Sequence, residues 1–276
     1  MQIQIITGAG KPFGPQYLLF RLMECWQEAG HTVAVGPQRQ LDADVGIVHV
    51  DSTVVPAHCL PNNPHARPLV NGGILDISKT RISRQRVLRG DDWAGPVIVK
   101  TNDNAHGGPE FRTLGRWSLP RLCRRLTKRL PWQWVGCLPR AHYPVLDRQT
   151  DVPGWVWRRP ELIVERFLPE RDGTDYVLRS WLFFGEQGYS VKLVGPHPIV
   201  KAGNICRHEY LHEVPDSIRA ARLSLGVDFG KFDYVLVDGE AVLLDVNKTP
   251  SILGPRTPNL IRLASGLAAL ADRVHA

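Results

Sequence analysis

The sequence predicts a mixed α/β and α+β protein, with an α/β domain at its N-terminus. Three observations lead to this prediction. Residues 1–50 alternate short apolar strands with one helix, which is typical of a parallel sheet. Later strands come in neighbouring pairs joined by tight turns, as in antiparallel hairpins. The 276 residues, 43% of them hydrophobic, suffice to bury a core in one large domain or in two to three subdomains.

The first segment is expected to contain strands over residues 2–6, 32–35 and 45–50, with a helix over residues 15–29. Glycines 8, 10 and 14 lie in the turn after the first strand, where two nucleotide motifs also place glycine. A P-loop needs Ser or Thr after its lysine, whereas Lys11 is followed by Pro12. A dinucleotide fold needs an acid after the second strand, and Val35-Gly36-Pro37 offers none. We therefore expect these glycines to serve the turn.

The composition favours a cytoplasmic protein. The chain opens directly on an apolar strand and contains no apolar run of about eighteen residues, so we expect neither a secretion signal nor a membrane span. The cysteines are scattered and lack a close pair, which disfavours a disulfide framework and a cysteine zinc site. They are Cys25, Cys59, Cys123, Cys137 and Cys206.

Much of the net charge of +7 lies between Arg112 and Arg148. This stretch mixes basic residues with tryptophans, namely Arg116, Arg121, Arg124, Arg125, Lys128 and Arg129 with Trp117, Trp132 and Trp134. Such a patch attracts anions and could follow nucleic acid. A solvated basic helix face, or a subdomain that handles phosphates or carboxylates, is commoner, so we do not expect a nucleic-acid partner.

A lysine ends the buried strand predicted over residues 95–100. The loop after it, residues 101–110, is polar and contains Gly107 and Gly108, so its backbone amides can approach phosphate oxygens. Lys100 at the mouth of this loop is a candidate phosphate partner; the alternative is an ordinary surface lysine.

The C-terminal half continues with a strand over residues 161–168 that breaks at Pro169. Further strands are expected over residues 176–184 and 189–194, and helices over residues 216–225 and 258–274.

The runs 232–237 and 241–246 predict a hairpin that turns through Asp238-Gly239. A two-residue loop would put Asp233 and Asp245 on different faces, whereas a three-residue loop that includes Glu240 sets them opposite each other. We expect the three-residue loop.

Asn247 then lies on the same face as the two acids, and the three side chains offer the hard oxygen donors that Mg²⁺ prefers. A cation would also offset the repulsion between two opposed carboxylates. The alternative is a surface hairpin whose acids face water.

In their order, these segments resemble the ATP-grasp superfamily, in which two small α+β subdomains hold ATP behind an N-terminal α/β domain. The hairpin that closes with Asp-Val-Asn-Lys-Thr-Pro resembles the family's magnesium pattern, and Lys100 with its glycine loop looks like the family's nucleotide lysine and phosphate-covering loop. The likeness spans essentially the whole chain. It implies an N-terminal pre-ATP-grasp domain (1–75), a central subdomain (76–160) and a C-terminal subdomain (161–276).

The resemblance also implies roles for single residues. Asp233, Asp245 and Asn247 would hold Mg²⁺, or Mn²⁺, on the phosphates of ATP. The phosphates would be steadied by Lys100 and Lys79 under the loop of Gly107 and Gly108. The adenine would meet the hinge Glu165-Arg166-Phe167-Leu168, with Asp175 near the ribose.

Three cations are implied in catalysis. Lys231 lies where D-alanine:D-alanine ligases have an arginine that stabilises an oxyanion, and Arg179 and Lys192 are further candidates for the anionic transition state. Two features depart from the family. Asp245 replaces the usual glutamate, and Lys79 lies closer to Lys100 than in typical relatives.

A rival motif, His208-Glu209-Tyr-Leu-His212, fits the His-Glu-x-x-His pattern of zinc metalloproteases, which requires a helix. Pro215 follows three residues after His212, which favours a polar loop or an edge strand instead.

The resulting hypothesis is an ATP-dependent ligase that joins a small-molecule or peptide carboxylate to an amine, or to a thiol, through an acyl phosphate. The likeness is nearest to small ribosomal-protein glutamate ligases and unassigned ATP-grasp proteins. A kinase acting on a hydroxyl and a non-catalytic ATP-binding protein remain the alternatives.

Overall fold

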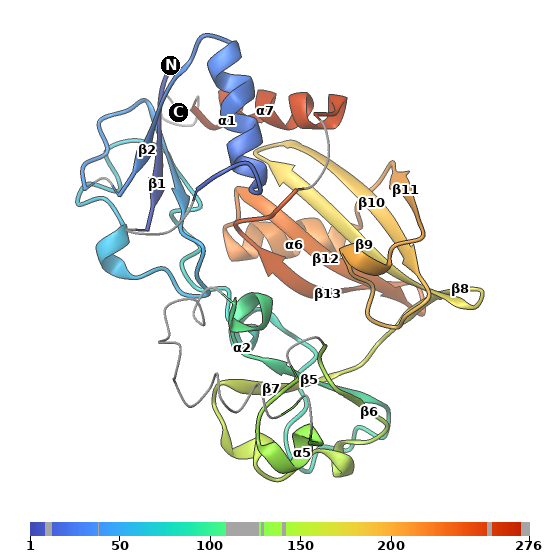
Figure 1. Ribbon diagram of the computed structural model, residues 1–276. Coiled ribbons are helices and arrows are strands. Elements are labelled where there is room, and N and C mark those ends of the chain that lie inside the picture. The colour runs from blue at the N-terminus through green and yellow to red at the C-terminus, as the bar shows by residue number, and fades with distance from the viewer. Residues whose placement is uncertain are drawn as a thin grey trace. The chain divides into compact units, whose positions relative to one another are not determined.

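The computed structural model describes residues 1–8, 13–37, 39–108, 127, 130–139, 142–252 and 256–271. The chain divides into two compact units (Figure 1). Unit 1 combines Met1–Asp76 with Pro169–Ala276, and unit 2 is Ile77–Leu168. No helix in the described ranges is long and apolar enough to cross a membrane.

A four-stranded parallel sheet forms the N-terminal part of unit 1, in the order β2-β1-β3-β4. Its strands are β1 (Gln2–Thr7), β2 (Thr32–Gly36), β3 (Val45–His49) and β4 (Leu69–Val70). Helix α1 (Leu18–Glu28) begins three residues after the expected start, because Tyr17 instead forms a β-bridge with Ser251.

A six-stranded antiparallel sheet forms the rest of unit 1. Its order is β11-β10-β9-β12-β13, with β8 also paired to β9. The strands are β8 (Glu170–Asp172), β9 (Asp175–Phe184), β10 (Gln187–Gly195), β11 (Arg207–Leu211), β12 (Phe229–Val237) and β13 (Glu240–Asn247). Helix α6 (Asp216–Leu225) has the bounds that the sequence predicts, and α7 (Pro258–Ala271) begins where expected.

Helices α1 and α7 pack together and share one core with both sheets of unit 1 (Figure 1). The indole of Trp26 on α1 donates to the Ala264 carbonyl on α7 at 2.8 Å. Gly266 lets α7 approach β9 closely, because a Cβ there would lie 2.1 Å from the Phe184 carbonyl oxygen.

Asn71 joins the two sheets of unit 1. Its fully buried side chain accepts hydrogen bonds from the backbone amides of Asp228 and Phe229 at 3.0 and 3.1 Å and donates to the Phe229 carbonyl at 2.8 Å. Its own backbone amide donates to the Asp228 carboxylate at 3.0 Å. The residue has a positive φ of 60°, which asparagine tolerates better than most residues.

Unit 2 is built on a three-stranded antiparallel sheet in the order β6-β5-β7. Its elements are β5 (Val97–Thr101), β6 (Val145–Leu146), β7 (Leu162–Arg166), and the short helices α2 (Lys79–Ile82) and α5 (Trp132–Val135). Valines from β5 and β7 form its core with tryptophans around them. In the basic stretch between Arg112 and Arg148, the clustered arginines and lysines and Trp117 lie outside the described residues.

Single-turn 3₁₀ helices connect these elements. They span Ala57–Cys59, Asn104–Gly107, Gln149–Asp151, Val156–Arg158 and Ala202–Asn204.

We predict that Asn71→Ala lowers the free energy of unfolding by about 3 kcal/mol, because it leaves buried backbone groups of residues 228 and 229 without partners. Urea unfolding measures the change. Asn62→Ala, at an exposed position, is the control. Equal effects of the two substitutions would show that Asn71 does not join the sheets.

Candidate functional site

The hairpin of β12 and β13 turns through two residues, not three. Val237 pairs with Glu240, and Asp238 and Gly239 between them both have positive φ, 51° and 84°. Such angles suit a tight hairpin turn. The three-residue loop expected from the sequence was therefore wrong.

A β-bulge nevertheless produces the expected pairing of the two acids. Asp233 pairs with Asp245 while Tyr234 pairs with Leu243, so Leu244 is an extra residue in β13. A bulge of this kind shifts the alternation of side chains by one residue. Asp233 and Asp245 consequently share one face of the sheet, and the next pair on that face is Lys231 with Asn247.

Neighbouring groups hold the oxygen atoms of this hairpin in place. The two carboxylate oxygens of Asp233 accept from the Ser180 hydroxyl and from Lys231 Nζ, the latter at 2.8 Å. Asp245 Oδ1 accepts from the Val246 amide at 3.0 Å, and Asn247 Oδ1 accepts from the Thr249 amide at 2.9 Å. An oxygen that accepts one hydrogen bond keeps a second lone pair for a cation.

Lys231 balances part of the negative charge. Burial opposes its positive charge, but the Asp233 and Asp245 carboxylates outweigh burial and raise the pKa of Lys231 above its usual value. The lysine is therefore charged at neutral pH and lies on the same face as both acids.

The donor set fits a hard divalent cation. Two carboxylates and an amide oxygen are ligands of Mg²⁺ and Mn²⁺, and Mg²⁺ commonly completes its shell with water and phosphate oxygens. Among the described residues, no group of three or more His, Cys, Asp or Glu side chains could hold a metal ion. With three protein oxygens, a six-coordinate cation on this hairpin would complete its shell with further oxygen ligands, such as those of water or phosphate.

The segment after Asn247 is tied to the N-terminal sheet. Thr249 Oγ1 donates to Asp51 at 3.2 Å, and the Tyr17 hydroxyl donates to the other oxygen of Asp51 at 2.9 Å. The Leu18 amide also donates to the Pro250 carbonyl at 2.8 Å. Sequence reasoning missed Asp51, although its position just after β3, at the carboxyl end of a parallel strand, is a signal for a site residue.

Unit 2 carries the predicted phosphate lysines. Lys100 on β5 forms an ion pair with Glu165 on β7 at 2.6 Å, and both side chains are largely buried. Lys79, at the start of α2, is buried too, and its backbone amide donates to the Asn102 carbonyl at 2.9 Å. The structure therefore places the start of α2 beside the end of β5, which sequence separation alone did not reveal.

Other predicted nucleotide residues lie at the ends of elements. Gly107 ends a 3₁₀ helix with a φ of 65°, and a Cβ at Gly108 would meet no heavy atom within 4 Å. The Phe167 amide donates to the Pro96 carbonyl at 2.9 Å, and the Arg166 guanidinium lies 4.9 Å from the centre of the Trp93 ring.

The expected adenine hinge also coincides with a boundary between units. Leu168 is the last residue of unit 2, and Asp175 lies beyond it at the start of β9 in unit 1.

The structure does not bring Arg179 and Lys192 to Asp233. Arg179 on β9 pairs with Lys192 on β10, whereas Asp233 pairs with Ser180, the next residue of β9. Because neighbouring residues of a strand point to opposite faces, Arg179 and Lys192 lie on the face opposite to Asp233. Arg179 forms a bidentate ion pair with Glu170 at 2.7 to 3.0 Å, and Lys192 binds Asp172 at 2.8 Å.

These ion pairs shift the pKa values of two of the partners. The hydrogen bonds that Arg179 donates to Glu170 raise the pKa of Arg179, and the one that Lys192 donates to Asp172 lowers the pKa of Asp172.

The zinc-protease alternative is wrong. His208 and Glu209 lie in edge strand β11 and not in a helix, so adjacent residues of the motif point to opposite faces. His212 follows the end of that strand. The edge strand that Pro215 favoured is the structure observed.

Comparison with known proteins finds likeness in structure and not in sequence. No protein-family model and no curated protein sequence matches the chain. The D-alanine–D-alanine ligase of Bacillus anthracis complexed with ATP aligns with 99% of this chain and 98% of its own, at 12% identity and a TM-score of 0.52. Macrocyclase MdnC of Microcystis aeruginosa, bound with precursor peptide MdnA, aligns with 98% of this chain and 100% of its own, at 8% identity and a TM-score of 0.51.

A RimK domain protein, an ATP-grasp protein of Sphaerobacter thermophilus, covers 98% of this chain and 99% of its own at 11% identity, with a TM-score of 0.48. For the ligase and the macrocyclase, whose TM-scores exceed 0.5, identities of 12% and 8% show a shared fold alone.

A buried histidine lies two residues before Asp51. His49 packs edge-on against Phe13 and Tyr17, with ring centroids 5.1 and 4.9 Å away. Within the described part of the chain, neither of its ring nitrogens has a hydrogen-bond partner. Burial lowers the pKa of His49 from 6.5 to about 3, so the folded protein holds a neutral imidazole.

We predict that His49 makes the fold sensitive to acid. Because its pKa is lower in the folded state, its contribution to stability is present above about pH 6.5 and is lost as the pH falls toward 3. His49→Phe removes this loss, so the stability of the variant relative to wild type should rise by about 2 kcal/mol between pH 7.5 and pH 5. Urea unfolding at the two pH values measures it, with exposed His58→Phe as the control. A difference that does not change with pH would contradict the prediction.

Proposed function

We propose that this chain, which has the ATP-grasp fold of its structural neighbours, is an ATP-dependent ligase that joins a carboxylate to an amine. The observation that carries the proposal is the register of β12 and β13. It sets Asp233, Asp245 and Asn247 on one face beside Lys231. Two carboxylates and an amide oxygen next to a cation suit a metal-bound triphosphate.

The oxygen ligands and the lysines would have different roles in this reaction. Asp233, Asp245 and Asn247 would hold Mg²⁺, which supplies positive charge to the phosphate oxygens of ATP when bound. On unit 2, Lys100 and Lys79 carry positive charge that suits phosphate oxygens. Lys100 would donate to a phosphate oxygen while it keeps its bond to Glu165, since an ammonium has three donors.

The proposed reaction has two steps. An oxygen of the substrate carboxylate attacks the γ-phosphorus of ATP, and ADP leaves. The amine then attacks the acyl carbon of the resulting acyl phosphate, inorganic phosphate leaves, and the nitrogen loses a proton. In the second step, negative charge develops on the oxygen of the tetrahedral intermediate. Lys231, which shares a face with Asp233 and Asp245, is the cation that would stabilise this charge.

The proposed metal ligands give the sharpest test of this function. We predict that Asp245→Ala and Asp233→Asn fold but lose ATP turnover by roughly a hundredfold or more, on the scale of other groups that stabilise transition-state charge. The same variants should bind Mn²⁺ more weakly in the presence of ATP, as read by electron paramagnetic resonance.

Asp238→Asn is the matched control for these variants. It removes a carboxylate from the exposed turn of the same hairpin, at a positive φ that asparagine accepts. Full ATP turnover in Asp245→Ala would contradict the assignment of the metal ligands.

The reaction type is tested by product analysis. The protein is incubated with Mg-ATP and pools of carboxylates and amines, and ADP and new product masses are followed. A ligase gives ADP, phosphate and an amide. A stable phosphoester without an amide would identify a kinase instead, and nucleotide binding without ADP release would identify a non-catalytic ATP-binding protein.

A further inference from the structure

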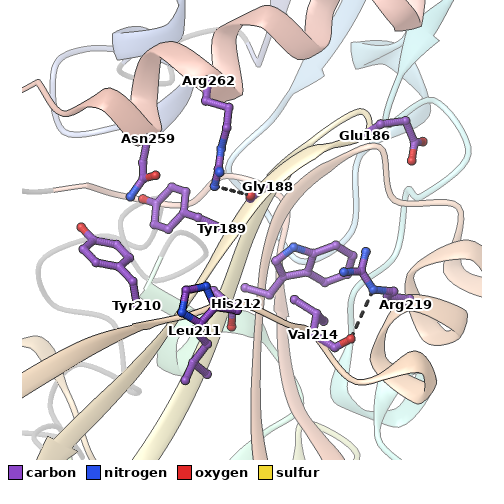
Figure 2. A pocket seen from close by; sticks show the side chains of 12 residues that line it. Glu186, Gly188, Tyr189, Tyr210, Leu211, His212, Val214, Arg219, Asn259 and Arg262 are labelled. Atoms are coloured by element: carbon purple, nitrogen blue, oxygen red, sulfur yellow. Dashed lines mark hydrogen bonds between the residues drawn. The ribbon is translucent and has the colours of Figure 1, made fainter.

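A cavity of about 460 Å³ lies in unit 1 at the end of strand β10 (Figure 2). Polar and aromatic side chains from β10, β11, α6 and α7 line it. We call it the β10 edge pocket and define it by Tyr189, Tyr210, His212, Arg219, Asn259 and Arg262. The proposed ligase site uses none of these residues.

The pocket exists because strand β10 extends beyond the end of its neighbour β11. Strand β11 pairs with residues Ser190–Val194 of β10 and ends at Leu211, so Gly188 and Tyr189 extend beyond it. Arg262 occupies the place of the missing strand and donates to the Gly188 carbonyl at 2.6 Å (Figure 2). Gly188 has no side chain to fill the space, and a Cβ there would lie 2.7 Å from the Trp181 indole nitrogen.

The chemistry of the lining favours an anion. Among the lining residues that the structure describes there are two guanidinium groups, those of Arg219 and Arg262, and one carboxylate, that of Glu186. A guanidinium has five N–H donors, so Arg262 keeps several after its bond to Gly188. The arginine guanidinium also binds a carboxylate in a bidentate geometry, with two parallel hydrogen bonds.

Two tyrosines add neutral donors and an apolar wall. The rings of Tyr189 and Tyr210 meet edge to face, with centroids 6.0 Å apart. Burial raises the pKa of Tyr189 to about 12, so its hydroxyl stays protonated at neutral pH and can donate a hydrogen bond. Asn259, in the first turn of α7, contributes an amide (Figure 2).

The register of the sheet places this tyrosine pair on the face that carries Asp233 and Asp245. Asp233 pairs with Ser180, Ser180 with Val191, and Val191 with Tyr210. Paired residues point to the same side of a sheet, and neighbouring strands lie about 4.8 Å apart. Tyr210 is thus three strands, or roughly 14 Å, from Asp233 on the same face.

We propose that the β10 edge pocket binds the carboxylate of a small molecule that also carries an apolar or aromatic group. Arg262 and the two tyrosine hydroxyls bind the carboxylate, and the tyrosine rings contact the apolar part. Because the pocket lies well away from Asp233, the bound carboxylate serves recognition and is not the group that reacts. Its role as a substrate anchor rests on the proposed ligase function, whereas the binding itself does not.

Calorimetric titration of the full chain without nucleotide tests the binding. The probes are N-acetyl-L-phenylalanine, the neutral N-acetyl-L-phenylalaninamide, L-phenylalanine and inorganic phosphate. We expect one or both acids to bind at least tenfold more tightly than the amide and than phosphate. Whether the blocked or the free amino acid binds better distinguishes a peptide end from a free amino acid as the source of the carboxylate.

Variants tie the binding to the pocket. Arg262→Gln should weaken binding of the acid at least tenfold. Arg171→Gln, which removes the same charge from an exposed strand away from the pocket, should leave it unchanged. Tyr210→Ala, at a half-exposed position, should weaken binding severalfold and serves as a second variant should Arg262→Gln fail to fold.

The proposal is overturned if neither acid binds, if acid and amide bind equally, if phosphate binds as tightly as the acid, or if Arg171→Gln weakens binding as much as Arg262→Gln. Failure of the ligase function is seen separately, as an absence of ATP turnover with intact carboxylate binding. Where turnover is found, Arg262→Gln should raise the KM of the substrate that the pocket holds and leave kcat unchanged.

Discussion

The candidate site depends on the pairing of two like charges across neighbouring strands. Opposed carboxylates repel, and a sheet would ordinarily avoid placing Asp233 against Asp245. Here the bulge at Leu244 enforces the pairing, while Lys231 and the Ser180 hydroxyl bind one of the two acids. A shift of one residue in either strand would turn one carboxylate to the other face. Register therefore determines whether the hairpin can hold a cation at all.

The remainder of unit 1 restrains that hairpin from two sides. Strand β9 pairs with β12 along the stretch that contains Asp233, and the segment after Asn247 is bound to the N-terminal sheet through Asp51. The structure thus gives the N-terminal sheet a part in positioning a proposed metal ligand. Unit 2 contains a separate charged pair, Lys100 with Glu165, on its own small antiparallel sheet.

The local sequence pattern predicted the strands of the hairpin and the place of its turn, but not its bulge or the contacts between distant segments. The alternation of apolar residues located both strands of the hairpin, and the Asp238-Gly239 dipeptide located its turn. The pairing of Asp233 with Asp245 was confirmed, but through a bulge, because a two-residue turn with a bulge and a longer turn without one give the same alternation. The contacts of Asp51 with Thr249 and of Lys79 with Asn102 could not be predicted, because they join segments that are distant in sequence. Arg179 and Lys192 illustrate the same limit, since only the register of β9 shows which face each occupies.

The position of a bound ion tests whether Asp233, Asp245 and Asn247 hold a metal. Crystals grown with Mn²⁺ and a non-hydrolysable ATP analogue allow that ion to be located by its anomalous scattering. We expect a peak within metal-ligand distance, roughly 2.1 Å, of oxygens from Asp233, Asp245 and Asn247. A nucleotide-bound ion ligated by other residues, with these three side chains turned away from it, would show that the hairpin is not the metal site.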